Sequence, residues 1–155
     1  MLARIVLAAV LVATLACRPA DGTSQSPGPP ETQGAWIQML PGTVWTALTI
    51  GGVAALPTAE PTIEFDAVGV RGSTGCNEWG GRPTFGPGGA FTVSEISMTK
   101  RACAPAVAGE EVAFLAAIRG ATSIAFDGRR LHVGGPGGEI VLQAGVGIGG
   151  ALDRA

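Results

Sequence analysis

Two cysteines in the middle of the chain, Cys76 and Cys103, restrict its fold more than any other sequence feature. Cys76 follows an apolar segment and a Gly-Ser-Thr-Gly turn, and Cys103 follows a polar, basic run. A bond between their sulfurs would close a loop of about 28 residues and stabilise the fold by about 3.5 kcal/mol in the chain-entropy model. Whether they pair depends on the compartment, because disulfides persist where the surroundings are oxidising.

The first residues of the chain predict export. Arg4 precedes an apolar run at residues 5–13, and the small residue Ala16 stands directly before Cys17. Residues 1–16 therefore have the order of a secretory signal peptide and are too short for a permanent membrane span. The last residues resemble a bacterial lipobox, although Thr14 stands where leucine is commonest. This resemblance implies a lipoprotein signal peptide and acylation of Cys17; the alternative is an ordinary signal peptide with an incidental cysteine.

Acylation of Cys17 would leave Cys76 and Cys103 as an even pair in an oxidising compartment, which favours a disulfide over two free thiols. A metal site is the rival interpretation, but two sulfurs and the distant His132 do not supply a tetrahedral ligand set. We therefore expect neither a metal nor another cofactor. The lipid would anchor the protein on the extracytoplasmic side of the membrane. Arg18, rather than Asp, after the cysteine favours the outer membrane if the cell has two.

Residues 17–41 are rich in Pro, Gly, Ser and Thr, a composition that buries little apolar surface and predicts a flexible linker behind the lipidated N-terminus. Cleavage after Ala16 would remove Arg4 and no acidic residue, so that nine basic and twelve acidic residues give a formal charge of −3. Lys100 is the only lysine. No basic stripe is available to neutralise phosphates, which excludes nucleic acid as an expected partner.

Twenty-five glycines and eleven prolines among 155 residues argue against a helical bundle, because each inside a helix costs roughly 1 to 3 kcal/mol relative to alanine. The apolar patterning instead predicts a mainly β domain at residues 42–143. The expected strands lie at residues 43–50, 62–65, 68–71, 83–85, 90–93, 123–126, 130–133 and 139–142. A helix is expected at about residues 105–119, and an irregular passage follows Cys76. Residues 144–155 are expected to form a flexible tail.

The order of these residues resembles the META domain family, the envelope lipoproteins similar to the heat-shock protein HslJ. The most specific part is a motif that consists of Gly75, Cys76, Asn77, Met98, Thr99 and Cys103. The aromatic residue that usually follows the Gly-Cys-Asn group has no clear counterpart here. The resemblance covers about residues 42–143 and implies a strongly curved antiparallel sheet, or a small lipocalin-like barrel, with one α-helix packed on it.

Nothing in the sequence predicts a catalytic residue. Ser97 and Lys100 match the Ser-x-x-Lys pattern of penicillin-interacting enzymes, but the companion motifs are missing and the chain is too short for that fold. Asn77 and Thr99 are expected to be scaffold residues, because such side chains often satisfy turns. Trp79 and Phe85, in the irregular passage, are the candidate ligand-contacting residues.

The predicted function is that of a non-enzymatic bacterial envelope lipoprotein, acting in envelope maintenance or in stress and drug tolerance through contacts with an envelope protein. The alternative is a barrel protein of the envelope that binds a small molecule or lipid beside Trp79 and Phe85. The sequence does not determine the oligomeric state.

Overall fold

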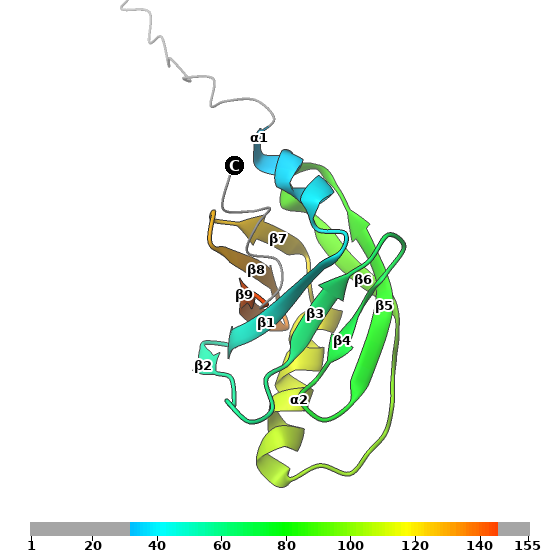
Figure 1. Cartoon of the computed structure of the whole chain (residues 1–155), viewed down its shortest axis with the longest axis vertical. Coiled ribbons are helices and arrows are strands. Elements are labelled where there is room, and N and C mark those ends of the chain that lie inside the picture. Colours follow the sequence, from blue (N-terminus) through cyan, green and yellow to red (C-terminus); the bar gives the residue numbers. More distant parts are fainter. Residues whose placement is uncertain (1–31, 146–155) are drawn as a thin grey trace, which may run out of the picture.

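The computed structural model describes residues 32–145, and within this range nine strands form one antiparallel sheet (Figure 1). The strands are β1 (Thr43–Ile50), β2 (Val53–Ala54), β3 (Thr62–Phe65), β4 (Val70–Ser73), β5 (Glu78–Phe85), β6 (Phe91–Met98), β7 (Ser123–Phe126), β8 (Arg130–Gly135) and β9 (Gly138–Ala144). The helical elements are α1 (Thr32–Ala35), η1 (Trp36–Met39), η2 (Pro87–Gly89) and α2 (Pro105–Arg119). None of the helices in the described range is long and apolar enough to cross a bilayer.

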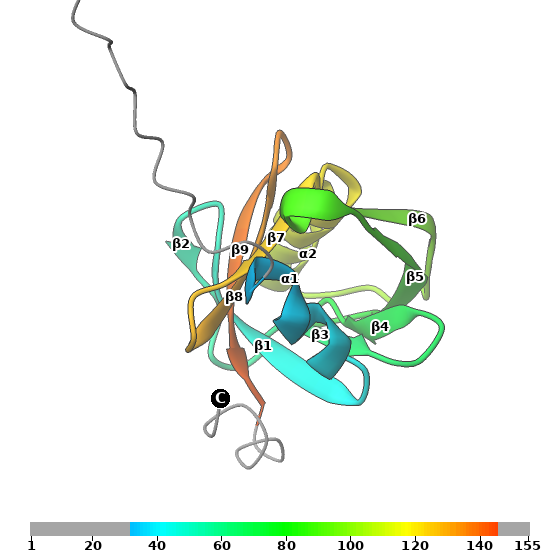
Figure 2. The ribbon, with the colours of Figure 1, turned by 90° about the horizontal axis from the view of Figure 1, so that it is seen from above.

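The sheet runs in the order β6-β5-β4-β3-β1-β9-β8-β7, with β2 paired to β1. It curls until its outer strands approach each other, where Ala90 and Ser123 form a single bridge and the Phe91 amide donates to the Thr122 carbonyl at 3.1 Å. Seen from above, α2 lies at the side of the sheet between β7 and β6 (Figure 2). The prediction of a mainly β, strongly curved antiparallel sheet with one packed α-helix at residues 105–119 is confirmed.

The concave side of the sheet and one face of α2 share the core. Phe114, Leu115 and Ile118 of the helix are buried among sheet residues such as Trp45 and Leu131. Trp79 packs edge-on against Phe114 with ring centroids 5.6 Å apart. Because α2 supplies the apolar surface that the incompletely closed sheet lacks, its position determines whether the core excludes water.

Two hairpins depend on an aspartate that holds the turn. Asp66 Oδ1 accepts hydrogen bonds from the amides of Val68 and Gly69, and Asp127 Oδ1 accepts from those of Arg129 and Arg130. These backbone donors lower the pKa of both carboxyl groups. The Asp-Gly turn between residues 123–126 and 130–133 is confirmed by β7 and β8, which pair in the predicted hairpin.

The prediction of an irregular passage after Cys76 is wrong, because residues 78–85 form the eight-residue strand β5. Gly81 adjoins a bulge where the pairing with β6 shifts, and a Cβ there would lie 2.6 Å from Val93 Cγ1. Beyond Gly81, β5 pairs only with β6 in the described sheet, so Pro83 stands where a missing N–H is tolerated. Close packing explains the glycine at position 81, and the lack of a second neighbouring strand in the described sheet explains why proline is tolerated at position 83.

The folded part begins before the expected boundary at residue 42. Residues 32–39 form α1 and η1, where the linker at 17–41 was expected, and Leu40 is buried. Trp36 packs against Phe126, with ring centroids 6.0 Å apart, which explains why this part of the segment is structured. At the other end, β9 includes Ala144. The expectations for the signal peptide at 1–16, for Cys17 and for the tail beyond residue 145 lie outside the described residues.

Gly75 and Gly109 provide a matched pair of tests. Gly75 has φ +91°, and a Cβ would lie 2.1 Å from the Ala59 carbonyl oxygen, whereas a Cβ on Gly109 in α2 would meet nothing within 4 Å. We expect Gly75→Ala to lower the free energy of unfolding by at least about 2 kcal/mol. Gly109→Ala should raise it by about 0.5 to 1 kcal/mol, because alanine favours the helix. Denaturant unfolding measures both; equal effects would contradict this account.

Candidate functional site

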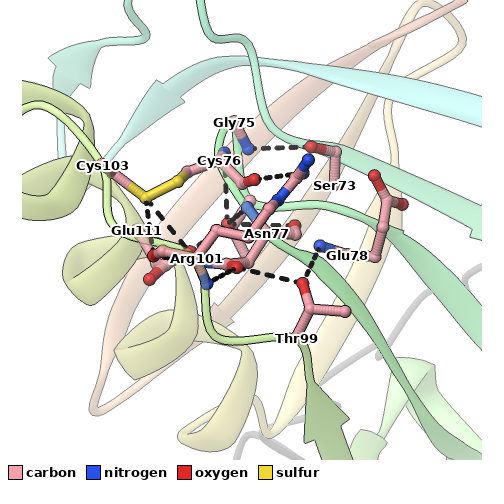
Figure 3. Close-up of a disulfide and its surroundings, with 10 residues drawn as sticks. Ser73, Gly75, Cys76, Asn77, Glu78, Thr99, Arg101, Cys103 and Glu111 are labelled. Atoms are coloured by element: carbon pink, nitrogen blue, oxygen red, sulfur yellow. Dashed lines mark hydrogen bonds between the residues drawn. A yellow bond between two sulfur atoms is a disulfide. The ribbon is translucent and has the colours of Figure 1, made fainter.

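The predicted motif residues gather at the end of the sheet where α2 begins, around the side chain of Asn77 (Figure 3). We call this group the Asn77 cluster; it consists of Thr74, Cys76, Asn77, Thr99, Arg101, Cys103 and Glu111. Its members come from the turn after β4, from the segment between β6 and α2, and from α2 itself. Met98 lies at its border, opposite Trp79 in the pairing of β5 with β6.

A disulfide joins Cys76 to Cys103, with their Cα atoms 6.1 Å apart. It links the turn after β4 to the segment that leads into α2. Arg101 reinforces the same connection, because its guanidinium donates to the Cys76 carbonyl oxygen. The covalent bond and the hydrogen bond therefore act between the same two segments.

Asn77 is 1% exposed and hydrogen-bonded on both sides of its amide. Its Oδ1 accepts from the Arg101 backbone amide at 2.7 Å and from the Thr99 hydroxyl at 3.0 Å. Its Nδ2 donates to Glu111 Oε2 at 2.9 Å. Asn77 thus connects the turn, the segment before α2 and the helix, which agrees with the scaffold role expected for Asn77 and Thr99.

Glu111 is the charged member of the cluster and is 9% exposed. Its Oε2 accepts from Asn77 and from the hydroxyl of Thr74, a residue with no exposed surface. The sequence prediction left both Glu111 and Thr74 out of the site. Glu111 could have been found, because it lies among apolar residues on the face of the predicted helix, and a carboxylate at such a position needs hydrogen-bond partners.

The chemistry open to the cluster is limited by its own bonds. Cys76, Cys103 and Glu111 form a group whose candidate ligand atoms lie within 4.8 Å of one another. The two sulfurs are bonded to each other, however, and it is the thiolate that binds a metal or attacks a substrate. The amide of Asn77 and the Glu111 Oε2 atom are engaged with the chain itself. The arrangement is suited to fixing α2 on the sheet.

Trp79 and Phe85, the residues expected to contact a ligand, lie apart on β5. They stand near opposite ends of β5, about 20 Å apart along an extended strand. Trp79 is 3% exposed, and its indole N–H donates to the Thr62 carbonyl oxygen at 3.2 Å. Phe85 packs against Phe65 and Phe91. The irregular loop assumed for this site is a strand, whereas ligand contact by Trp79 or Phe85 stays a prediction. Trp79 lines a surface hollow of about 350 Å³ together with Ser97 and Thr99.

We expect the disulfide to form when the protein is produced in an oxidising compartment and to contribute up to about 3.5 kcal/mol to its stability. Mass spectrometry of a non-reduced digest should contain the peptide pair joined through Cys76 and Cys103. The double variant Cys76→Ser/Cys103→Ser should unfold at lower denaturant concentration, whereas Cys17→Ser should not change the midpoint. Two free thiols in the non-reduced protein would contradict the bond.

The polar pair Asn77 and Glu111 can be tested by exchanging the positions of amide and carboxylate. Asn77→Asp places two carboxylates side by side, and we expect a loss of about 3 kcal/mol at neutral pH. Protonation of one carboxyl would relieve the repulsion between the two groups in the folded state. The variant should regain stability as pH falls.

The second substitution Glu111→Gln, added to Asn77→Asp, restores an amide donor opposite a carboxylate and should recover much of the loss. Glu111→Gln alone, which places an amide opposite the amide of Asn77, serves as the control. Thermal or denaturant unfolding across the pH range measures the four proteins. A double variant no more stable than Asn77→Asp would show that this hydrogen bond does not control the cluster.

Comparisons with known proteins agree with this architecture. Among solved structures, an NMR structure of a protein from Burkholderia xenovorans matches with TM-score 0.59 and 19% identity over 83% of this chain and 99% of the other. A second NMR structure matches with TM-score 0.58 and 16% identity over 68% of this chain and 92% of the other. At these identities the likeness shows the fold alone. The comparison with curated proteins gives no match. The family model of the META domain matches residues 38–145, and the chain therefore belongs to the META domain family.

Proposed function

We propose that the chain is a non-enzymatic lipoprotein of the bacterial cell envelope, whose META domain is held on the extracytoplasmic side of the membrane by acylated Cys17. The lipobox-like sequence at Cys17 is the observation that carries this proposal. It stands in front of a domain of a family that the sequence resemblance associates with envelope lipoproteins. The proposed role is envelope maintenance or tolerance of stress and drugs.

The chemistry of the Asn77 cluster supports a scaffold role over catalysis. Its acceptors and donors join three segments of the chain, and its sulfurs form a disulfide. The ring nitrogens of His132 lie near carboxylates at the surface of the β7–β9 region, Nδ1 3.2 Å from Glu139 and Nε2 3.4 Å from Asp127. These arrangements favour a stable module that acts through contact with an envelope protein.

The geometry of the first described residues suits attachment at one end of the domain. In Figure 1 α1 lies at one end, and the first turn of α2 lies at the other. Residues 18–31 connect Cys17 to α1 and can span at most about 50 Å when fully extended. An acylated Cys17 would therefore keep the domain close to the membrane surface, with its α1 end nearest to the point of attachment.

The anchor is tested by Cys17→Ser, which should move the protein from the membrane fraction to the soluble fraction because the acyl chains supply the membrane affinity. Thr14→Leu is the matched control: it changes the same segment towards the commoner lipobox sequence and should leave the protein in the membrane fraction. Fractionation and the mass of the N-terminal peptide measure both. A membrane fraction unchanged by Cys17→Ser would contradict the anchor.

The physiological part of the proposal needs a cellular measurement. A strain that lacks the gene should be more sensitive to heat, detergent or antibiotics that act on the envelope. The wild-type gene should restore tolerance, and the Cys17→Ser gene should restore less of it at equal protein level. Unchanged sensitivity of the deletion strain across these challenges would count against the envelope role.

A further inference from the structure

A cavity of about 260 Å³ lies between α2 and the segment around β2. One wall consists of Ile50, Val53 and Leu56, and the helix supplies Ala106, Gly109 and Ala113. These helix residues are small, so they leave space between α2 and the opposite wall of the cavity. The cavity lies apart from Trp79 and Phe85, where the sequence placed a ligand.

One charged side chain, Glu110, lines this apolar cavity. Its Oε2 accepts a hydrogen bond from the Leu56 backbone amide at 2.7 Å. Its Oε1 is shielded from solvent and has no hydrogen-bond partner within the described residues. A buried carboxylate oxygen without a donor is unfavourable, and native structures leave few such atoms unpaired.

We propose that this cavity binds a small amphiphilic cation, which places an ammonium group on Glu110 and an apolar body against α2 and β2. The ammonium group would supply the donor that Oε1 lacks, and a hydrogen bond between two charged groups is stronger than one between neutral groups. None of the residues that line the cavity is basic, so the carboxylate has no competing cation there. The volume, below the usual range of drug-sized pockets, suits a short chain or a fragment-sized molecule.

For Oε1 to face the cavity the Glu110 side chain has to turn, which needs no change of the backbone. Rotation about the terminal bond of a glutamate side chain has a broad, shallow energy profile, so the carboxylate can turn towards the cavity. Gly109, one residue before Glu110, leaves open space on the helix. Val53 is 70% exposed, which shows that this wall lies at the surface.

The proposal adds ligand binding to the proposed function and does not depend on the lipid anchor. It is tested on the full chain with Cys17→Ser, so that loss of acylation and loss of binding are measured separately.

Hexylammonium is the probe, and hexanoate is the matched molecule with the opposite charge. We expect hexylammonium to shift the Leu56 amide signal in ¹H–¹⁵N NMR spectra in a saturable manner, because this amide is bonded to Glu110. The indole signal of Trp36, which follows α1 at the other end of the domain, should not move.

Three variants assign the binding to the cavity. Glu110→Gln keeps an acceptor for Leu56 and removes the charge, and it should weaken hexylammonium binding at least about tenfold. Ala113→Leu should block the cavity by filling it. Val112→Leu is the control, because Val112 is 69% exposed, lies next to Ala113 and does not line the cavity; it should bind like the parent. Dispersed spectra establish that each variant is folded.

Several results would overturn the proposal. These are the absence of a saturable shift at Leu56, equal binding of hexanoate and hexylammonium, and unchanged affinity in Glu110→Gln or in Ala113→Leu. Each result concerns the cavity alone, since membrane attachment is measured independently through Cys17.

Discussion

The buried amide of Asn77 is the interaction on which the arrangement of sheet and helix depends. It joins Thr99 and Arg101, in the segment after β6, to Glu111 of α2. An amide is suited to this position because it accepts on one side and donates on the other. A carboxylate could not donate to Glu111, and an apolar side chain would remove the hydrogen bonds that Asn77 forms with the Thr99 hydroxyl, the Arg101 amide and Glu111.

The curled sheet explains why this link matters. Its outer strands meet only near Ala90 and Ser123, and α2 contributes core residues along the side that the strands leave incomplete. The disulfide and Asn77 both act close to the first turn of α2, whereas close contacts of Gly120 and Gly137 fit its last turn to the β8–β9 hairpin. The helix is thus fixed at both ends, and the apolar contacts of Phe114 between them can be dense.

The elements that the sequence predicts well are those with a local physical cause. Pro105 and Gly120 delimit α2, and an Asp-Gly turn joins β7 to β8. The elements that it predicts poorly depend on distant partners. β5 carries glycine and proline where a strand is disfavoured, and it forms a strand through pairing with β6 and, as far as Gly81, with β4. Glu111 could be suspected from its apolar surroundings, but its partners could not, since Thr74 and Asn77 precede it by more than thirty residues.

The two neighbouring glutamates of α2, Glu110 and Glu111, have different surroundings. The stabilising hydrogen bonds and the proposed ligand binding therefore belong to different side chains. Glu111 points to the Asn77 cluster, where its Oε2 accepts two hydrogen bonds, while Glu110 lines the cavity with one oxygen bonded to Leu56 and the other without a donor. Adjacent positions on a helix face different directions. A single turn of α2 can therefore fix the helix to the sheet on one side and present a carboxylate to the cavity on the other, so that either property can change without loss of the other.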